Sequence, residues 1–249
     1  MSDFDALVLL PGALLEPSEE LLRRLGAFRR VIVVSYSDAT RMGDLTDAIA
    51  GQLAAAGIQR AAVLGSSYGG WVAQCLARRH PALVQRLILV HTFALRPDAA
   101  WRFRLALKIW KALPGALLRR LMMARVRRML RPLLDRSPEE HQLALTDVRE
   151  LIHSPGTLAS LLRQNTCMLD SVTSFPIAPS DLARLDGKIL IIESDDDPAV
   201  RAPERAHLRA MVPGAEVRTF QGTGHVTALV QPDEFVSAVE GFLSATDST

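Results

Sequence analysis

Short apolar runs alternate with helical segments along this 249-residue chain, and this alternation restricts its fold more than any other feature. The runs occupy residues 6–10, 31–34, 60–64, 86–90, 188–192 and 216–220, each the length of a single β-strand. Between them apolar side chains recur at helical spacing, as Leu45, Ile49 and Leu53 do. Strands that alternate with helices indicate a mostly parallel sheet with helices on both faces. We therefore predict an α/β fold with about six strands, in which residues 31–34 form a buried strand.

Strand-like runs are absent from residues 93–183, where apolar side chains follow helical spacing instead. The helical stripes are Leu105, Ile109 and Leu113, and then Leu117 and Leu121. We predict that residues 1–92 and 184–249 form the α/β core, and that residues 93–183 form a helical cap inserted after the fourth strand. Leu105 and Leu113 are expected to face an apolar cap interior.

Bulk composition excludes several classes of protein. The chain is 49% hydrophobic, enough for a sizeable core, yet no apolar run reaches the roughly 20 residues that span a bilayer. The apolar run at residues 6–10 is too short for a signal peptide, so a cytoplasmic location is expected. The two cysteines, Cys75 and Cys167, offer neither a disulfide framework nor metal-ligand spacing. We expect no metal and no organic cofactor, and no motif indicates nucleic-acid binding.

Residues 65–69 match the pattern G-x-S-x-G, between the strand-like run 60–64 and a helical segment at 71–79. A serine placed between a strand and a helix must take a strained backbone conformation, which lifts its hydroxyl clear of the sheet. The flanking glycines leave room for the adjoining strand and helix. An ordinary strand-to-helix loop is the alternative, but the context favours Ser67 as a nucleophile.

A serine hydroxyl needs a base, and the base needs an acid to orient it. Among six histidines, His225 follows the last strand-like run, and side chains beyond the carboxyl ends of parallel strands gather at one edge. The chain order Ser…Asp…His places the acid after run 188–192, where Asp195, Asp196 and Asp197 are adjacent. We prefer Asp197 because a turn before proline can aim one carboxylate inward; the other two aspartates, or solvated charges in a turn, are the alternatives.

Further candidates follow the first and fourth strand-like runs. The oxyanion of an acyl-transfer reaction needs N–H donors. Tyr68, directly after the nucleophile, offers one, and Ala13 offers another if Gly12 turns the backbone inward; a plain strand-ending turn is an equal alternative. Gly12 and His91 are candidates for the substrate pocket. For His91 the favoured alternative is a histidine that is hydrogen-bonded near the sheet edge.

Together these pieces resemble the α/β-hydrolase family over nearly the whole chain. The matching motifs, in the family's order, are the turn at 65–69, Ser194-x-x-Asp197 before Pro198, and Gly224-His225. The resemblance implies an α/β-hydrolase fold with a cap that shapes substrate choice. It also implies Ser67 as nucleophile, Asp197 as acid, His225 as base, and Ala13 and Tyr68 as oxyanion donors.

The chain departs from the family's pattern at three points. It has Pro11-Gly12 where the family often has His-Gly, and Ser194 where the family has glycine. The run at residues 6–10 before Pro11 stands almost at the start of the given sequence, so the family's usual first two strands are not expected in it. The compact start is similar to maspardin-like members, some of which act as binding proteins.

The function that fits these residues is hydrolysis of a carboxylic ester or thioester through an acyl-enzyme, with a small-molecule substrate that carries an apolar acyl group. Amide hydrolysis, lactone opening and C–C cleavage use the same three groups and stay open. A non-catalytic binding protein on the same fold is the competing class. It has no physical need for a nucleophile, a base and an acid together.

Charge is distributed unevenly along the chain. Residues 96–136 contain 12 Lys/Arg and 2 Asp/Glu, although the whole chain has a net charge of only +2. The favoured interpretation is a set of amphipathic cap helices with a solvated cationic face. Contact with a membrane surface and recognition of an anionic partner are the alternatives. The oligomeric state is not predicted.

Overall fold

The computed structural model describes residues 4–94, 96, 98 and 100–245. Within them, six strands form one sheet in the order β2-β1-β3-β4-β5-β6, and every neighbouring pair is parallel. The strands are β1 (Ala6–Leu10), β2 (Val31–Val33), β3 (Ala61–Ser66), β4 (Val84–Val90), β5 (Ile189–Ser194) and β6 (Glu216–Phe220). This confirms the predicted fold. Residues 1–3 and 246–249 of the predicted core, and residues 95, 97 and 99 of the predicted cap, lie outside the described residues.

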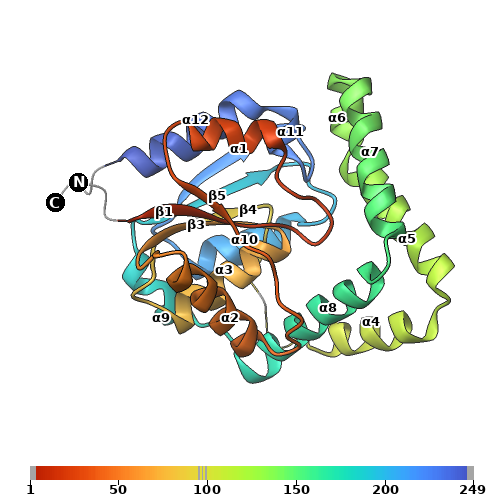
Figure 1. Ribbon diagram of the computed structural model, residues 1–249, viewed down its shortest axis with the longest axis horizontal. Helices are drawn as coiled ribbons and strands as arrows, with labels where there is room; N and C mark the ends of the chain where they lie inside the picture. Colours follow the sequence, from red (N-terminus) through yellow and green to blue (C-terminus); the bar gives the residue numbers. More distant parts are fainter. Residues whose placement is uncertain (1–3, 95, 97, 99, 246–249) are drawn as a thin grey trace.

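Helices cover both faces of the sheet (Figure 1). The helices of the core are α1 (Glu19–Gly26), α2 (Met42–Ala55), α3 (Tyr68–Arg79), α10 (Ala202–Met211), α11 (Thr227–Val230) and α12 (Pro232–Ser244). Side chains of β1 alternate between the two layers: Val8 and Leu10 pack with residues of α2 and α3, whereas Leu7 and Leu9 pack with residues of α1 and α12. Because both faces are covered, all five residues of β1 are buried.

The prediction that the second strand is buried was wrong. β2 lies at one edge of the sheet, and none of its three residues is fully buried. Val33 is 39% exposed. An apolar run of this length has the same pattern in an edge strand as in a central strand, so its pattern did not reveal the position.

A helical insertion separates β4 from β5, as predicted, and the described residues of this segment contain no strand. Its helices are α4 (Ala100–Ala112), α5 (Gly115–Met129), α6 (Arg131–Arg136), α7 (Pro138–His153), α8 (Thr157–Ser174) and α9 (Pro179–Leu182), followed by a 3₁₀ turn, η2 (Ala183–Leu185). In Figure 1 the helices α4 to α8 lie to one side of the sheet, beyond the carboxyl ends of the strands.

Several parts of the insertion contact the core. On the side of α2, Asp170 of α8 accepts a hydrogen bond from the Met42 N–H at 2.8 Å. On the other side, apolar residues of α5, α6 and α7 form a cluster with Val226 and Val230, next to the loop after β6. The insertion therefore packs directly against the loop that carries His225.

The predicted apolar interior of the insertion does not include Leu105. Its side chain is 49% exposed, and Ile109 is exposed to the same extent, whereas Leu113 is half-buried. Helical spacing identifies a common face but not the direction in which that face points. Among the described residues, none of the helices combines the length and apolarity needed to span a bilayer.

Candidate active site

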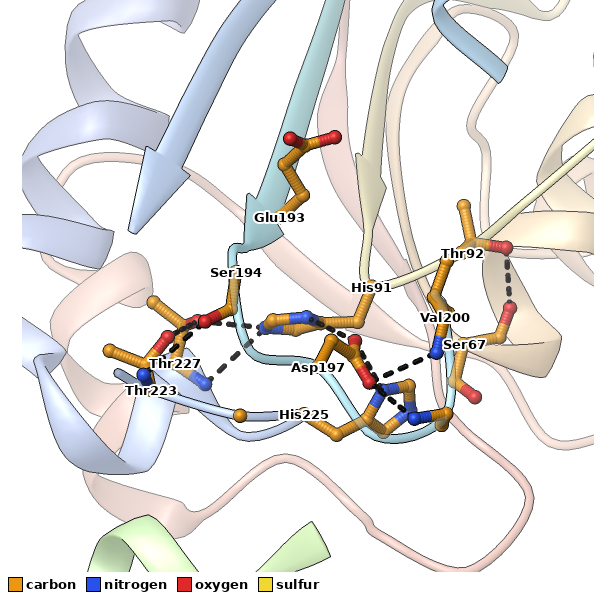
Figure 2. Close-up of polar contacts among 12 residues, drawn as sticks. Ser67, His91, Thr92, Glu193, Ser194, Asp197, Val200, Thr223, His225 and Thr227 are labelled. Atoms are coloured by element: carbon orange, nitrogen blue, oxygen red, sulfur yellow. Dashed lines mark hydrogen bonds and ion pairs between the residues drawn. The ribbon is translucent and has the colours of Figure 1, made fainter. Parts of the chain in front are cut away.

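Ser67 is the single residue between the end of β3 and the start of α3. Its backbone has φ 52° and ψ −113°, a conformation that residues other than glycine rarely adopt. Two hydrogen bonds hold it: the Ser67 N–H donates to the carbonyl of Val90 at the end of β4 at 2.9 Å. The Thr92 hydroxyl donates to the Ser67 carbonyl at 2.8 Å (Figure 2). The strained turn predicted from the sequence is therefore present.

Close backbone packing explains the glycines on each side of this serine. A Cβ atom on Gly69 would overlap the carbonyl groups of Leu10 and Pro11, and one on Gly65 would overlap the backbone of Gly69 and Gly70. Helix α3 can therefore begin against the end of β1 only if these positions lack side chains.

The loop after β1 lies directly beside the serine. A Cβ atom on Gly12 would be 3.7 Å from the Ser67 Cβ, so the backbone of this loop reaches the predicted nucleophile. The Tyr36 hydroxyl donates to the Pro11 carbonyl at 2.7 Å and fixes the loop. Tyr68 begins α3, and the first N–H groups of a helix have no partner within it. Gly12 and Tyr68 thus lie beside the serine, and the role of Ala13 and Tyr68 as oxyanion donors stays a prediction.

One of the three adjacent aspartates contacts His225. Its Nδ1 lies 2.8 Å from Oδ2 and 3.0 Å from Oδ1 of Asp197 (Figure 2). The other two brace the surrounding loops: Asp196 accepts from the Ser194 hydroxyl and the Gly224 N–H, and Asp195 accepts from the Gly222 N–H. The geometry therefore favours Asp197 as the acid.

The buried carboxylate of Asp197 accepts hydrogen bonds at both of its oxygens. Its Oδ1 accepts from the N–H groups of Ala199 and Val200 at 2.7 and 3.0 Å, and its Oδ2 is 3.0 Å from Nδ1 of His91. Burial opposes the charge, but the hydrogen bonds from His225 and His91 outweigh it and hold the pKa of Asp197 well below its ordinary value. The group is therefore ionised at neutral pH.

His91 joins this carboxylate to a second network. Its backbone has φ 47°, its side chain is buried, and its Nε2 lies 2.8 Å from the Thr227 hydroxyl, which in turn contacts the Thr223 hydroxyl at 2.6 Å. Burial lowers the pKa of His91, so the ring is neutral at neutral pH. A carboxylate only accepts hydrogen bonds, so we assign the single ring proton to Nδ1, and Nε2 accepts from Thr227.

The sequence alone does not reveal this second network. Its members come from three distant segments, and nothing in the sequence marks Thr227 apart from its position two residues after His225. Gly12, His91 and His225 also line a cavity of about 100 Å³ with apolar neighbours that include Leu9, Val90 and Phe235. Ser66 lines it as well, on the strand that leads to the nucleophile. Substrate binding by Gly12 and His91 stays a prediction.

The other nitrogen of His225, Nε2, is buried and has no hydrogen-bond partner among the described residues. Because Nδ1 donates to Asp197, Nε2 carries the lone pair and can accept a proton. His91, Asp197 and His225 offer ligand atoms within 4.8 Å of one another, a spacing that also suits a metal ion. These atoms already satisfy one another by hydrogen bonds, so a proton-transfer assembly explains the cluster.

The chain is similar in sequence and in structure to known hydrolases. A curated relative, 2-hydroxymuconate semialdehyde hydrolase of Pseudomonas putida, is 26% identical over 203 residues, which cover 80% of this chain and 67% of that protein. The sn-1-specific diacylglycerol lipase ABHD11 of Mus musculus is 22% identical over 237 residues, which cover 91% of this chain and 75% of the lipase. A solved meta-cleavage product hydrolase, CumD of Pseudomonas fluorescens IP01, superposes with a TM-score of 0.70 at 22% identity, covering 95% of this chain and 89% of that chain.

The structural likeness establishes the fold alone, because the identity is low. The family assignment comes from the sequence model described as the alpha/beta hydrolase family, which matches residues 7–238. Since this match spans the sheet, the insertion and the loops that carry Ser67, Asp197 and His225, the chain belongs to the alpha/beta hydrolase family.

Proposed function

We propose that this chain is a serine hydrolase that cleaves a carboxylic ester or thioester through an acyl-enzyme intermediate at Ser67. The observation that carries the proposal is the orientation of His225. Its Nδ1 is hydrogen-bonded to an ionised aspartate, and its Nε2 is buried with no partner among the described residues, at the strand ends where the strained serine lies. A serine hydroxyl becomes a useful nucleophile when such a nitrogen can take its proton.

The first half of the reaction forms the acyl-enzyme. Ser67 Oγ attacks the carbonyl carbon while Nε2 of His225 takes the hydroxyl proton, and Asp197 stabilises the imidazolium that forms. The N–H groups of Ala13 and Tyr68 bind the oxyanion of the tetrahedral intermediate. The bond to the leaving alkoxide or thiolate then breaks, and His225 returns its proton to that group.

The second half repeats these steps with water. His225 takes a proton from the water as it attacks the acyl carbon, and then returns a proton to Ser67 Oγ as the acid product leaves. Every proton and electron pair is supplied by the substrate, water and the named side chains. Lactone opening and C–C cleavage use the same three groups, so the choice of an ester is supported by the ester-cleaving name of the diacylglycerol lipase relative.

Labelling with a fluorophosphonate tests this proposal. We expect wild-type protein to react at one residue, to be labelled at Ser67 in a peptide map, and to hydrolyse p-nitrophenyl esters in a series from acetate to palmitate. Ser67→Ala should abolish both activities. Ser237→Ala is the matched control, because Ser237 is an exposed serine of α12. Folded wild-type protein that resists the label would favour a binding protein, and label retained by Ser67→Ala would place the nucleophile elsewhere.

The hydrogen bond from His91 to Asp197 leads us to a separate prediction about how the reactivity of the protein depends on pH. His91→Phe removes one of the hydrogen bonds that hold the pKa of Asp197 low, so this pKa should rise and the carboxylate should lose its charge at a higher pH. We expect the acid limb of the inactivation rate with fluorophosphonate to move to higher pH.

His91→Asn is the control for that experiment. Its side-chain amide can donate at the position of Nδ1, and asparagine tolerates the positive φ of this residue. Its pH profile should stay close to that of the wild type. If His91→Phe lowers the rate equally at every pH, the residue supports the loop without influencing the charge of the assembly.

A further inference from the structure

Helix α4 of the insertion carries apolar side chains on two opposite faces. One face packs inward: Leu107 is 9% exposed, and the Phe103 ring meets the Trp71 ring edge to face, with 5.9 Å between centroids. The other face contains Trp101, Leu105 and Ile109, which are 58%, 49% and 49% exposed. These three recur at every fourth position, so they form one stripe along the helix. A helix with a single buried face does not need this second stripe.

Cationic side chains border the exposed stripe on both sides. Given 3.6 residues per turn, Arg102 lies at one border and Arg104, Lys108 and Lys111 lie at the other. Arg102 lies over the Trp101 ring, 5.5 Å from its centroid. In the part of the chain that the structure describes, none of the four has an ion-pair partner. Their charges are therefore available to an external anionic surface.

We propose that α4 docks on the surface of an anionic lipid bilayer. Trp101, Leu105 and Ile109 enter the boundary between headgroups and acyl chains, and the flanking Lys and Arg side chains meet the anionic headgroups. Tryptophan and long cationic side chains both favour this depth of a membrane, because each combines an apolar body with a polar end.

The distribution of charge distinguishes a bilayer from other occupants. Residues 96–136 contain 12 Lys/Arg and 2 Asp/Glu, so a second copy docked through the same face would bring two cationic surfaces together. A protein surface that binds nucleic acid carries cationic groups, polar groups and stacking rings across the whole contact. Here the centre of the face is largely aliphatic and the charge lies at its borders. An apolar centre with a cationic border matches the layered polarity of an anionic membrane.

Co-sedimentation with lipid vesicles tests this inference independently of hydrolysis. We expect the full-length protein to bind phosphatidylcholine vesicles that contain about one third phosphatidylglycerol, more weakly at high salt, and to bind pure phosphatidylcholine far less. The double variant Leu105→Glu/Ile109→Glu should reduce partitioning by about tenfold or more. Leu143→Glu is the matched control, because Leu143 is 65% exposed but lies on α7, and this variant should bind like the wild type.

Circular dichroism and fluorophosphonate labelling show that the variants are folded, since neither leucine nor the isoleucine belongs to the proposed catalytic site. The inference would be overturned by no binding of the wild type, by equal binding to neutral vesicles, by undiminished binding of the double variant, or by a dimer in solution that the double variant alone loses. If the protein binds duplex DNA and this binding depends on Leu105 and Ile109 in the same way, the partner of α4 is nucleic acid and not a bilayer.

Discussion

Replacement of His225 by alanine should lower kcat for a p-nitrophenyl ester by about four to six orders of magnitude. The variant lacks the group that we propose takes the proton of Ser67, and an un-ionised serine hydroxyl is a weak nucleophile. KM should change little, since the imidazole acts in the transition state and not in ground-state binding. Steady-state kinetics over a range of pH, with fluorophosphonate inactivation as a second readout, measure the effect.

The fold should survive this substitution. Asp197 would keep the hydrogen bonds from His91, Ala199 and Val200, so the loss of one partner should cost no more than about 1–2 kcal/mol of unfolding free energy. His153→Ala is the matched control, because this exposed histidine of α7 bonds only to a carbonyl of its own helix. If His225→Ala retains activity above about one hundredth of the wild type, a different residue is the base.

Local pattern was sufficient to predict the turn that carries the serine. Its glycines, its apolar strand and its helix are contiguous in sequence, and their spacing alone requires the strained conformation observed at Ser67. The contact of Asp197 with His225 agrees with the preference for this residue that the turn before proline suggested, and its role as the acid stays a prediction. The strand ends themselves follow from short apolar runs, which a parallel sheet buries on both faces.

Features that depend on distant partners could not be predicted in the same way. His91 contacts residues 106 and 136 positions further along the chain, and nothing local to His91 specifies them. Edge and central strands share one apolar pattern, which is why the exposure of β2 was missed. The stripe through Leu105 was correctly expected to be helical, but its outward direction depends on how α4 packs against the rest of the insertion.

Replacement of Asp197 by asparagine should lower the same kcat by about three to four orders of magnitude. The reason is the direction of the surrounding hydrogen bonds. The N–H groups of Ala199 and Val200 both donate to Oδ1, so the amide oxygen of asparagine will occupy that position. Its NH₂ group then replaces Oδ2, where it faces the Nδ1 atoms of His91 and His225.

An NH₂ group only donates, so each imidazole must move its proton from Nδ1 to Nε2. His225 then presents an N–H to Ser67 in place of a lone pair and cannot act as a base. Asp196→Asn is the matched control, because an amide oxygen can still accept from Ser194 and Gly224; its kcat should stay within about tenfold of the wild type. A larger loss in Asp196→Asn than in Asp197→Asn would assign the acid to the neighbouring residue. Nitrogen-15 chemical shifts of the imidazole rings would report the tautomer directly, and a proton that stays on Nδ1 of His225 in Asp197→Asn would contradict this mechanism.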